Sequence, residues 1–235
     1  MTIMKMNALF TFMLVLNGCT ESTINGQTIP EGKGIGGQCE GCEAIYENAT
    51  PANKLNWKLR LPDYNKQSPW LHITGTVYKA DGKSPAAGTI LYFYHTDRTG
   101  IYPKKGDEKG WGKRHGYIRG WLKTNNRGQY SLETFRPGAY PNRGIAAHIH
   151  CIVKEDNLNE YYIGDILFVD DPLLTNEEKT SLDVPGGSGL IKLQKRNGVL
   201  YGERDIYLGR NVRNYPASVV QHSEFILSHL IMAFN

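Results

Sequence analysis

The chain has 235 residues, 40% of them hydrophobic, which is enough for one well-buried domain with short appendages. Its formal net charge is +4, and no long basic run alternates with aromatic residues, so nucleic acid is not a predicted partner. The sequence also lacks the glycine fingerprints that bind nicotinamide or flavin cofactors, and no organic redox cofactor is therefore predicted.

The N-terminus has the pattern of an export signal. Lys5 precedes an apolar run over residues 8–16, which has the length of a signal-peptide core and is too short to span a bilayer. The run ends in Leu16-Asn17-Gly18-Cys19, which resembles a bacterial lipobox. We expect residues 1–18 to be a lipoprotein signal peptide and a lipid on Cys19 to anchor the exported chain to the bacterial cell envelope, on the periplasmic or outer face of a membrane. The alternative is an ordinary buried amphipathic segment.

Residues 19–66 are predicted to be a tether followed by an N-terminal extension. Residues 20–38 are polar and rich in glycine without periodicity, which is typical of a flexible linker. The extension contains Cys39 and Cys42. In a reducing compartment this spacing would also suit redox catalysis or half of a zinc site, but no second pair follows. For an exported chain a short structural disulfide is the favoured interpretation.

Residues 67–215 carry the pattern of a β-sandwich. Segments with a two-residue hydrophobic period, separated by glycine, proline and asparagine, occur at 71–78, 88–95, 117–123, 129–135 and 163–169. We therefore predict an all-β fold, a sandwich of two mainly antiparallel sheets with short helical segments in the loops. Thr175 and Glu178 form a capping-box pattern that predicts one such helix, and residues 199–208 suggest a closing strand pair.

The tail, residues 216–235, is apolar from Phe225 to Phe234. This stretch is too short to cross a membrane, so it either packs on the domain or mediates assembly, which leaves a homo-oligomer open.

A closely spaced histidine pair marks the candidate site. Along a strand, side chains alternate between faces, so His148 and His150 point to one face and Ile149 to the other. Two imidazoles on one face can share a metal, and Cys151 is predicted to be a buried apolar side chain instead. Tyr140 precedes a proline, which favours an extended backbone on the turn that leads into this strand. Its phenol becomes a good ligand beside a ferric ion, which stabilises the phenolate.

The spacing of several motifs resembles that of one family. The segments are His95-Thr96-Asp97-Arg98-Thr99-Gly100-Ile101-Tyr102, Arg119-Gly120, 128–134, Pro137-Gly138-Ala139-Tyr140-Pro141 and His148-Ile149-His150. Over roughly residues 68–210 the chain resembles the intradiol ring-cleavage dioxygenases, which include the catechol and protocatechuate dioxygenases. The resemblance implies that Fe(III) is held by Tyr102, Tyr140, His148 and His150. It also implies that the protein cleaves a catechol-type ring with O2 to a muconate-type dicarboxylate, and that Tyr140 leaves the metal when the substrate binds and takes up substrate protons.

Two positions depart from the family pattern. Ile145 stands where the better-known members have an arginine that stabilises the activated substrate, and Arg143 is the candidate substitute. Asp165 stands where a glutamine is expected near the substrate, and its carboxylate would repel a catecholate unless it were protonated or paired. The predicted catalytic set is Tyr140, Arg143 and Asp165.

The loop after Tyr102 is positively charged and could attract anionic aromatic substrates, although a solvated loop has the same composition. Its basic residues are Lys104, Lys105, Lys109, Lys113, Arg114 and His115.

A different class of function also fits the strand and turn pattern, which resembles non-catalytic β-sandwich modules of surface and carbohydrate-related proteins. A lipid-anchored binding protein with a structural metal site is a third reading that Ile145 keeps open.

Overall fold

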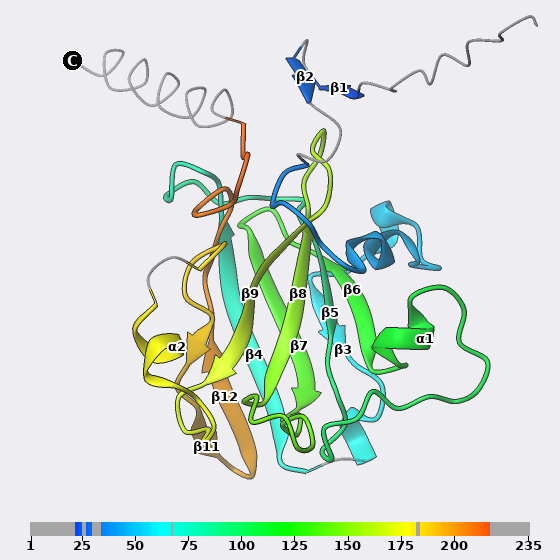
Figure 1. Cartoon of the computed structure of the whole chain (residues 1–235), viewed down its shortest axis with the longest axis vertical. Coiled ribbons are helices and arrows are strands. Elements are labelled where there is room, and N and C mark those ends of the chain that lie inside the picture. Colours follow the sequence, from blue (N-terminus) through cyan, green and yellow to red (C-terminus); the bar gives the residue numbers. More distant parts are fainter. Residues whose placement is uncertain (1–21, 25–26, 30–33, 67, 182–183, 217–235) are drawn as a thin grey trace, which may run out of the picture. The chain divides into compact units, whose positions relative to one another are not determined.

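The computed structural model describes residues 22–24, 27–29, 34–66, 68–181 and 184–216 (Figure 1). The predicted signal peptide, Cys19 and the tail after residue 216 lie outside these residues. The chain divides into two compact units, Met1–Glu31 and Gly32–Asn235. Among the described residues, no helix combines the length and the apolar character that crossing a bilayer requires.

The first unit contains two short strands where we predicted a tether without regular structure. β1 (Ser22–Ile24) and β2 (Gln27–Ile29) pair antiparallel, with Thr23 opposite Thr28. In the sequence they are separated by Asn25-Gly26, the dipeptide most typical of two-residue hairpin connections. That local signal is stronger than the glycine-rich composition on which the tether prediction was based.

The second unit is a sandwich of two sheets layered face to face (Figure 1). The five-stranded sheet has the order β10 (Leu190–Ile191), β9 (Tyr161–Phe168), β8 (His148–Lys154), β5 (Ile90–Tyr94) and β6 (Arg119–Lys123). The second sheet has the order β11 (Gln194–Arg196), β12 (Val199–Glu203), β4 (Trp70–Tyr78), β7 (Gln129–Phe135) and β3 (Lys58–Arg60), with β13 (Ile206–Tyr207) also paired to β4. The prediction of an all-β sandwich is confirmed.

Strand alternation divides the side chains between the core and the outer faces. In β8, Ile149 and Cys151 point into the space between the sheets and are fully buried, whereas His148 and His150 point to the outer face. In β5, Phe93 lies in the core between the sheets, while Tyr94 faces outward and packs against His150. The outer face of the five-stranded sheet is therefore where the histidine pair lies.

Several pairings are parallel, which the sequence analysis did not foresee. β3 pairs parallel with β7, β10 with β9, and both β12 and β13 with β4. The expected closing pair over 199–208 is wrong in one respect, because β12 and β13 each pair with β4 and not with each other. Since β3 belongs to the second sheet, this sheet includes residues before 67, where the sandwich was predicted to start.

The short helices lie in the connections, as predicted. The 3-10 helices are η1 (Cys42–Tyr46), η2 (Ala52–Lys54) and η3 (Tyr64–Lys66), and the α-helices are α1 (Gly112–His115) and α2 (Asn176–Thr180). The capping box at the start of α2 is confirmed, because Thr175 Oγ1 accepts from the Glu178 amide and the Glu178 carboxylate accepts from the Thr175 amide.

The segment around η1 covers part of the outer face of the five-stranded sheet. The disulfide predicted between Cys39 and Cys42 is present, with the two Cα atoms 5.7 Å apart. Ala44 and Ile45 of η1 are buried against outward-facing side chains of β5 and β8. Glu47, which ends η1, accepts a hydrogen bond from the Trp111 amide at 2.7 Å and so fixes η1 beside α1. The N-terminal extension thus forms one wall beside the histidine pair.

Candidate metal centre

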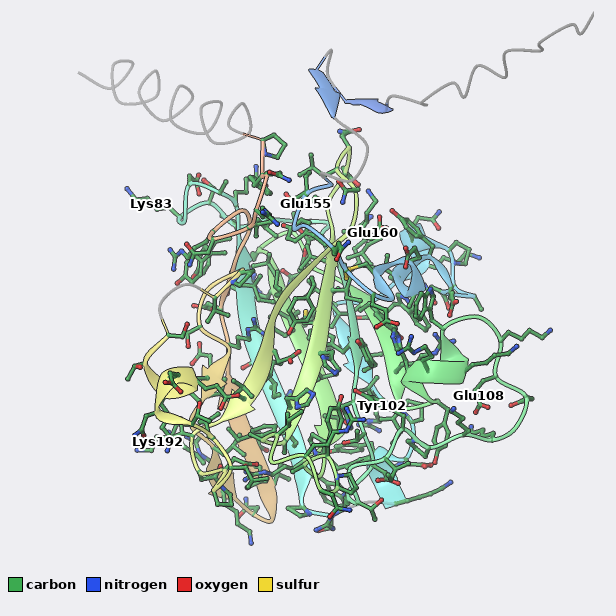
Figure 2. All side chains as sticks on the ribbon, in the orientation of Figure 1. Lys83, Tyr102, Glu108, Glu155, Glu160 and Lys192 are labelled. Carbon is green, nitrogen blue, oxygen red and sulfur yellow. A yellow bond between two sulfur atoms is a disulfide. The ribbon has the colours of Figure 1, made fainter. Side chains whose placement is uncertain are left out.

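Four donor atoms from separate parts of the chain meet on the outer face of the five-stranded sheet. Tyr102 Oη lies 2.5 Å from Tyr140 Oη and 2.8 Å from His150 Nε2. Tyr140 Oη lies 3.3 Å from His150 Nε2 and 3.2 Å from His148 Nε2, and the two Nε2 atoms are 3.2 Å apart. Tyr102 lies between the sheet and the loop that carries α1 (Figure 2). Metal–ligand distances of about 2 Å to oxygen and nitrogen fit a centre surrounded by donors at these separations.

The other nitrogen of each histidine determines which form the ring adopts. His148 Nδ1 lies 2.7 Å from the carbonyl oxygen of Ala146, which can only accept, so Nδ1 carries the proton. His150 Nδ1 lies 2.7 Å from Asp165 Oδ1 and donates to that carboxylate. In the neutral rings both Nε2 atoms then present lone pairs, which face each other and the two phenol oxygens. Such lone pairs repel unless a proton or a cation lies between them, and the donor set therefore fits a metal ion.

A β-bulge brings Asp165 to His150. In the register of β8 and β9, Ile149 is opposite Ile166 and Cys151 is opposite Ile163, so His150 alone faces two residues, Gly164 and Asp165. The extra residue reverses the alternation along β9, because Ile163 and Ile166 both point into the core. Asp165 consequently faces outward beside the histidine.

Asp165 is held as a carboxylate in this position. Burial alone would raise its pKa, but the electrostatic interaction with His150 and the hydrogen bond from its ring outweigh burial and hold the pKa of Asp165 below its usual value. The sequence analysis placed Asp165 near the substrate, where it would repel a catecholate unless paired. The structure pairs it with His150, where it orients the ring.

The two phenols are protonated before any cation binds. Burial and the hydrogen bond with Tyr140 raise the pKa of Tyr102 far above its ordinary value. Burial also raises the pKa of Tyr140, although the hydrogen bond from Tyr102 and the charge of Arg143 act in the opposite direction. A metal ion would have to displace these protons, which a highly charged cation does most readily.

Two cavities open beside the tyrosines. The larger, ≈ 510 Å³, is lined by Gly100, Ile101, Tyr102, Lys104, Arg114, Tyr140, Pro141 and Arg143. The smaller, ≈ 210 Å³, is lined by Glu40, Tyr94, Tyr102, Trp111, Arg114, His115, Tyr140 and His150. Arg143 thus lies at the larger cavity with both tyrosines, whereas Ile145 is not among its lining residues and is 40% exposed.

The residues named from sequence are brought together, and others join them. Tyr102, Tyr140, His148 and His150 form the centre, Asp165 lies behind His150, and Arg143 lies at the cavity. The sequence analysis missed Glu40, Tyr94 and Trp111 and did not assign His115 to the site. Tyr94 is directly opposite His150 in the sheet, with the two rings 4.4 Å apart. Only the pairing of β5 with β8 would have indicated Tyr94 as a site residue, and that pairing depends on contacts between strands distant in sequence.

Comparison with known proteins gives a match in fold. No protein-family model matches the chain, and no curated protein does. A protein described as dioxygenase Tetur07g02040 aligns over 68% of this chain and 88% of its own at 22% identity, with a TM-score of 0.50. An intradiol ring-cleavage dioxygenase from Tetranychus urticae aligns over 68% of this chain and 89% of its own at 21% identity, with a TM-score of 0.49.

Longer enzymes align less completely. Catechol 1,2-dioxygenase from Acinetobacter sp. ADP1 aligns over 68% of this chain but only 60% of its own, at 19% identity and a TM-score of 0.49. The solved structures similar to this chain are thus intradiol ring-cleavage dioxygenases, and the resemblance in sequence is matched by one in fold. Identities this low describe the fold alone, so the chemistry has to be argued from the centre itself.

Proposed function

We propose that this protein uses O2 to cleave a catechol-type aromatic ring between its two hydroxyl-bearing carbons, giving a muconate-type dicarboxylate. The proposed cofactor is a mononuclear, non-haem Fe(III) held by Tyr102, Tyr140, His148 and His150. The observation that carries the proposal is the convergence of two phenol oxygens and two imidazole Nε2 atoms, each within 3.3 Å of another atom of the set.

The charges of the centre favour a trivalent ion. Two phenolates and the Asp165 carboxylate together supply three negative charges, which Fe(III) would balance. Hard phenolate oxygens also favour Fe(III) over Fe(II). When bound, the ferric ion would supply the Lewis acidity that ionises a catechol and increases the electron density of its ring.

The protein side chains have separate tasks in this proposal. Tyr140 comes from the connection between β7 and β8, and its Oη is positioned to take up a proton as the diol binds. Arg143, at the same cavity, supplies positive charge beside the anionic substrate. Asp165 holds His150 in the form whose Nε2 can bind the metal.

The visible absorption spectrum of the iron-loaded protein tests the proposal. A ferric ion bound by phenolate gives a charge-transfer band, so we expect a broad visible band that weakens in both Tyr102→Phe and Tyr140→Phe and shifts when catechol is added without oxygen. Tyr94→Phe is the matched control, because the Tyr94 ring stacks on His150 while its hydroxyl is not one of the four donors. A colourless protein that binds zinc or no metal would contradict the proposal and favour a non-catalytic sandwich module.

We also propose that the mature chain is exported and anchored through a lipid on Cys19. The supporting observation is the leader of residues 1–18 and the Leu16-Asn17-Gly18-Cys19 sequence. The wild-type chain should sediment with membranes after expression in a bacterium, and Cys19→Ser should remain unprocessed. Wild-type protein recovered from the soluble fraction at its full precursor mass would contradict this proposal.

A further inference from the structure

The smaller cavity has a wall that no part of the proposed chemistry uses. The disulfide loop 39–42 contributes Glu40, and the segment of α1 contributes Trp111, Arg114 and His115. His115 is buried, yet it lies in a cavity that Tyr102, Tyr140 and His150 also line. A buried histidine at such a position either only packs against its neighbours or offers a ring nitrogen to a ligand that enters the cavity.

A chain of hydrogen bonds fixes the proton of the His115 ring. Glu47 Oε2 accepts from an Arg119 guanidinium nitrogen at 2.6 Å, and the Arg119 charge near the Tyr92 hydroxyl opposes burial, which raises the pKa of Tyr92. The Tyr92 oxygen lies 2.9 Å from His115 Nδ1. Nδ1 is the one acceptor within hydrogen-bond distance of the Tyr92 hydroxyl among the described residues, so Tyr92 gives its proton to Nδ1. The proton of the neutral His115 ring therefore resides on Nε2.

The Nε2 edge of His115 is held in place and has no protein partner. The ring stacks on Tyr94 with centroids 3.8 Å apart and planes 10° from parallel. Among the described residues Nε2 forms no hydrogen bond, and the fully enclosed side-chain nitrogens that lack a partner all belong to Arg204, so Nε2 is not sealed off from the cavity. Burial lowers the pKa of His115 to about 3, so the ring stays neutral at ordinary pH and keeps a single donor.

The backbone of Gly41 borders this edge. Gly41 has a φ of 88°, and a Cβ atom placed there would lie only 2.7 Å from His115 Nε2. The disulfide between Cys39 and Cys42 encloses Gly41 in a short loop. Glycine at this position therefore lets the disulfide loop approach the His115 ring closely, where any larger residue would clash with the Nε2 edge.

We infer that His115 is a positioning residue whose Nε2–H donates a hydrogen bond to an oxygen that the aromatic substrate carries in addition to its diol. The inference rests on the proposed function, because the diol occupies the metal centre while the third oxygen reaches the smaller cavity. The favoured ligands are catechols with a carbonyl or similar oxygen acceptor on the ring. The bond is directional, and it selects by hydrogen bonding and not by charge.

Binding without oxygen tests the inference. The visible band of the iron-loaded protein is titrated with catechol and with 3,4-dihydroxybenzaldehyde, a neutral diol with one added acceptor. In His115→Phe we expect the affinity for the aldehyde to fall about tenfold relative to that for catechol, the usual consequence of one lost hydrogen bond. His115→Gln, whose amide can donate in place of Nε2, should restore part of the preference. Equal losses for both ligands, or none, would overturn the inference.

A second measurement needs no metal. The nitrogen NMR signals of His115 in the metal-free protein should show the Nε2–H form, and Tyr92→Phe should produce a mixture of both forms. In the iron-loaded protein the same substitution should weaken aldehyde binding several-fold. A ring protonated on Nδ1 in the wild type would overturn the inference even if the ferric centre forms. Failure of catechol itself to shift the wild-type spectrum would instead contradict the proposed function, so the two failures are distinguishable.

Discussion

Buried histidines occur in two regions of this protein and behave differently. His95 is fully buried between the sheets, where Nδ1 donates to the Thr96 carbonyl at 2.6 Å and Nε2 lies 2.6 Å from Thr134 Oγ1. On the outer face of the five-stranded sheet, His148 and His150 each have an Nδ1 bonded away from the centre and an Nε2 that faces the other ring and the phenol oxygens. A buried histidine ring bonded only to a backbone carbonyl and a core hydroxyl is part of the framework, whereas ring nitrogens that converge with other ligand-type atoms mark a candidate binding site.

The largest expected effect is a difference in stability between substitutions of two neighbouring residues on β8. Ile149→Ala removes a fully buried side chain from the core and should lower the free energy of unfolding of the metal-free protein by about 2–5 kcal/mol. His148→Ala should cost about 1 kcal/mol or less, because the lost hydrogen bond is offset by relief of the opposed lone pairs. Urea unfolding in the presence of a chelator measures both. Equal losses would mean that the histidine pair supports the fold as much as the core does.

The second prediction concerns pH. Burial lowers the pKa of His95 to about 4 from 6.5, so the unfolded chain takes up this proton before the folded protein does. The associated stability is therefore complete above pH 6.5 and is lost as the pH falls toward 4, by about 3 kcal/mol. His95→Gln should flatten the dependence of the unfolding free energy on pH within this window.

The control for this prediction is His72→Gln. His72 lies on the second sheet, is only partly buried and bonds to Ser131 Oγ at 2.8 Å. The His72→Gln substitution should leave the dependence of the unfolding free energy on pH between 6.5 and 4 nearly as steep as in the wild type. A His95→Gln profile as steep as that of the His72 variant would show that the acid sensitivity arises elsewhere.

The third prediction tests the residue behind the metal centre. Asp165→Asn keeps an oxygen acceptor for His150 but removes the charge, and we expect iron affinity to fall about 10–100-fold with little change in folding stability. Competition with a chelator measures the affinity. Asp170→Asn, the same substitution at an exposed carboxylate paired with Arg136, is the matched control and should bind iron as the wild type does. Comparable affinity in both variants would mean that Asp165 does not support the centre.

Local patterns predicted most of the sandwich because they act over a few residues. β7 runs from Gln129 to Phe135 as its alternation indicated, and His148 and His150 share a face because the period of a strand is two. Tyr140 could be linked to the histidine strand by its place on the preceding turn, whereas Tyr102 could be named as a donor only through resemblance to a family. No periodicity links two tyrosines in connections to a pair of histidines on a strand.

The parts of the candidate site that the sequence did not predict depend on contacts between distant segments. The bulge opposite His150 reverses the alternation of β9 at Gly164, and an alternating pattern read from Ile163 would have placed Asp165 in the core. The wall formed by Glu40 and Gly41 likewise follows from the docking of η1 on the sheet, which a short cysteine pair does not specify. Positions that depart from a regular pattern are, in this protein, those nearest the candidate site.

The smallest expected effect separates two adjacent lysines of the loop after Tyr102. Lys104 lines the larger cavity, whereas Lys105 Nζ lies 4.6 Å from the centre of the Tyr117 ring and is not among the residues lining that cavity. If positive charge at the cavity attracts anionic aromatics, Lys104→Ser should weaken binding of a carboxylated catechol about two- to threefold at low salt, with the difference vanishing at high salt. Lys105→Ser removes the same charge one residue away and should have a smaller effect. Equal effects would indicate attraction by the loop as a whole, and no effect of either would show that these charges belong to a solvated loop.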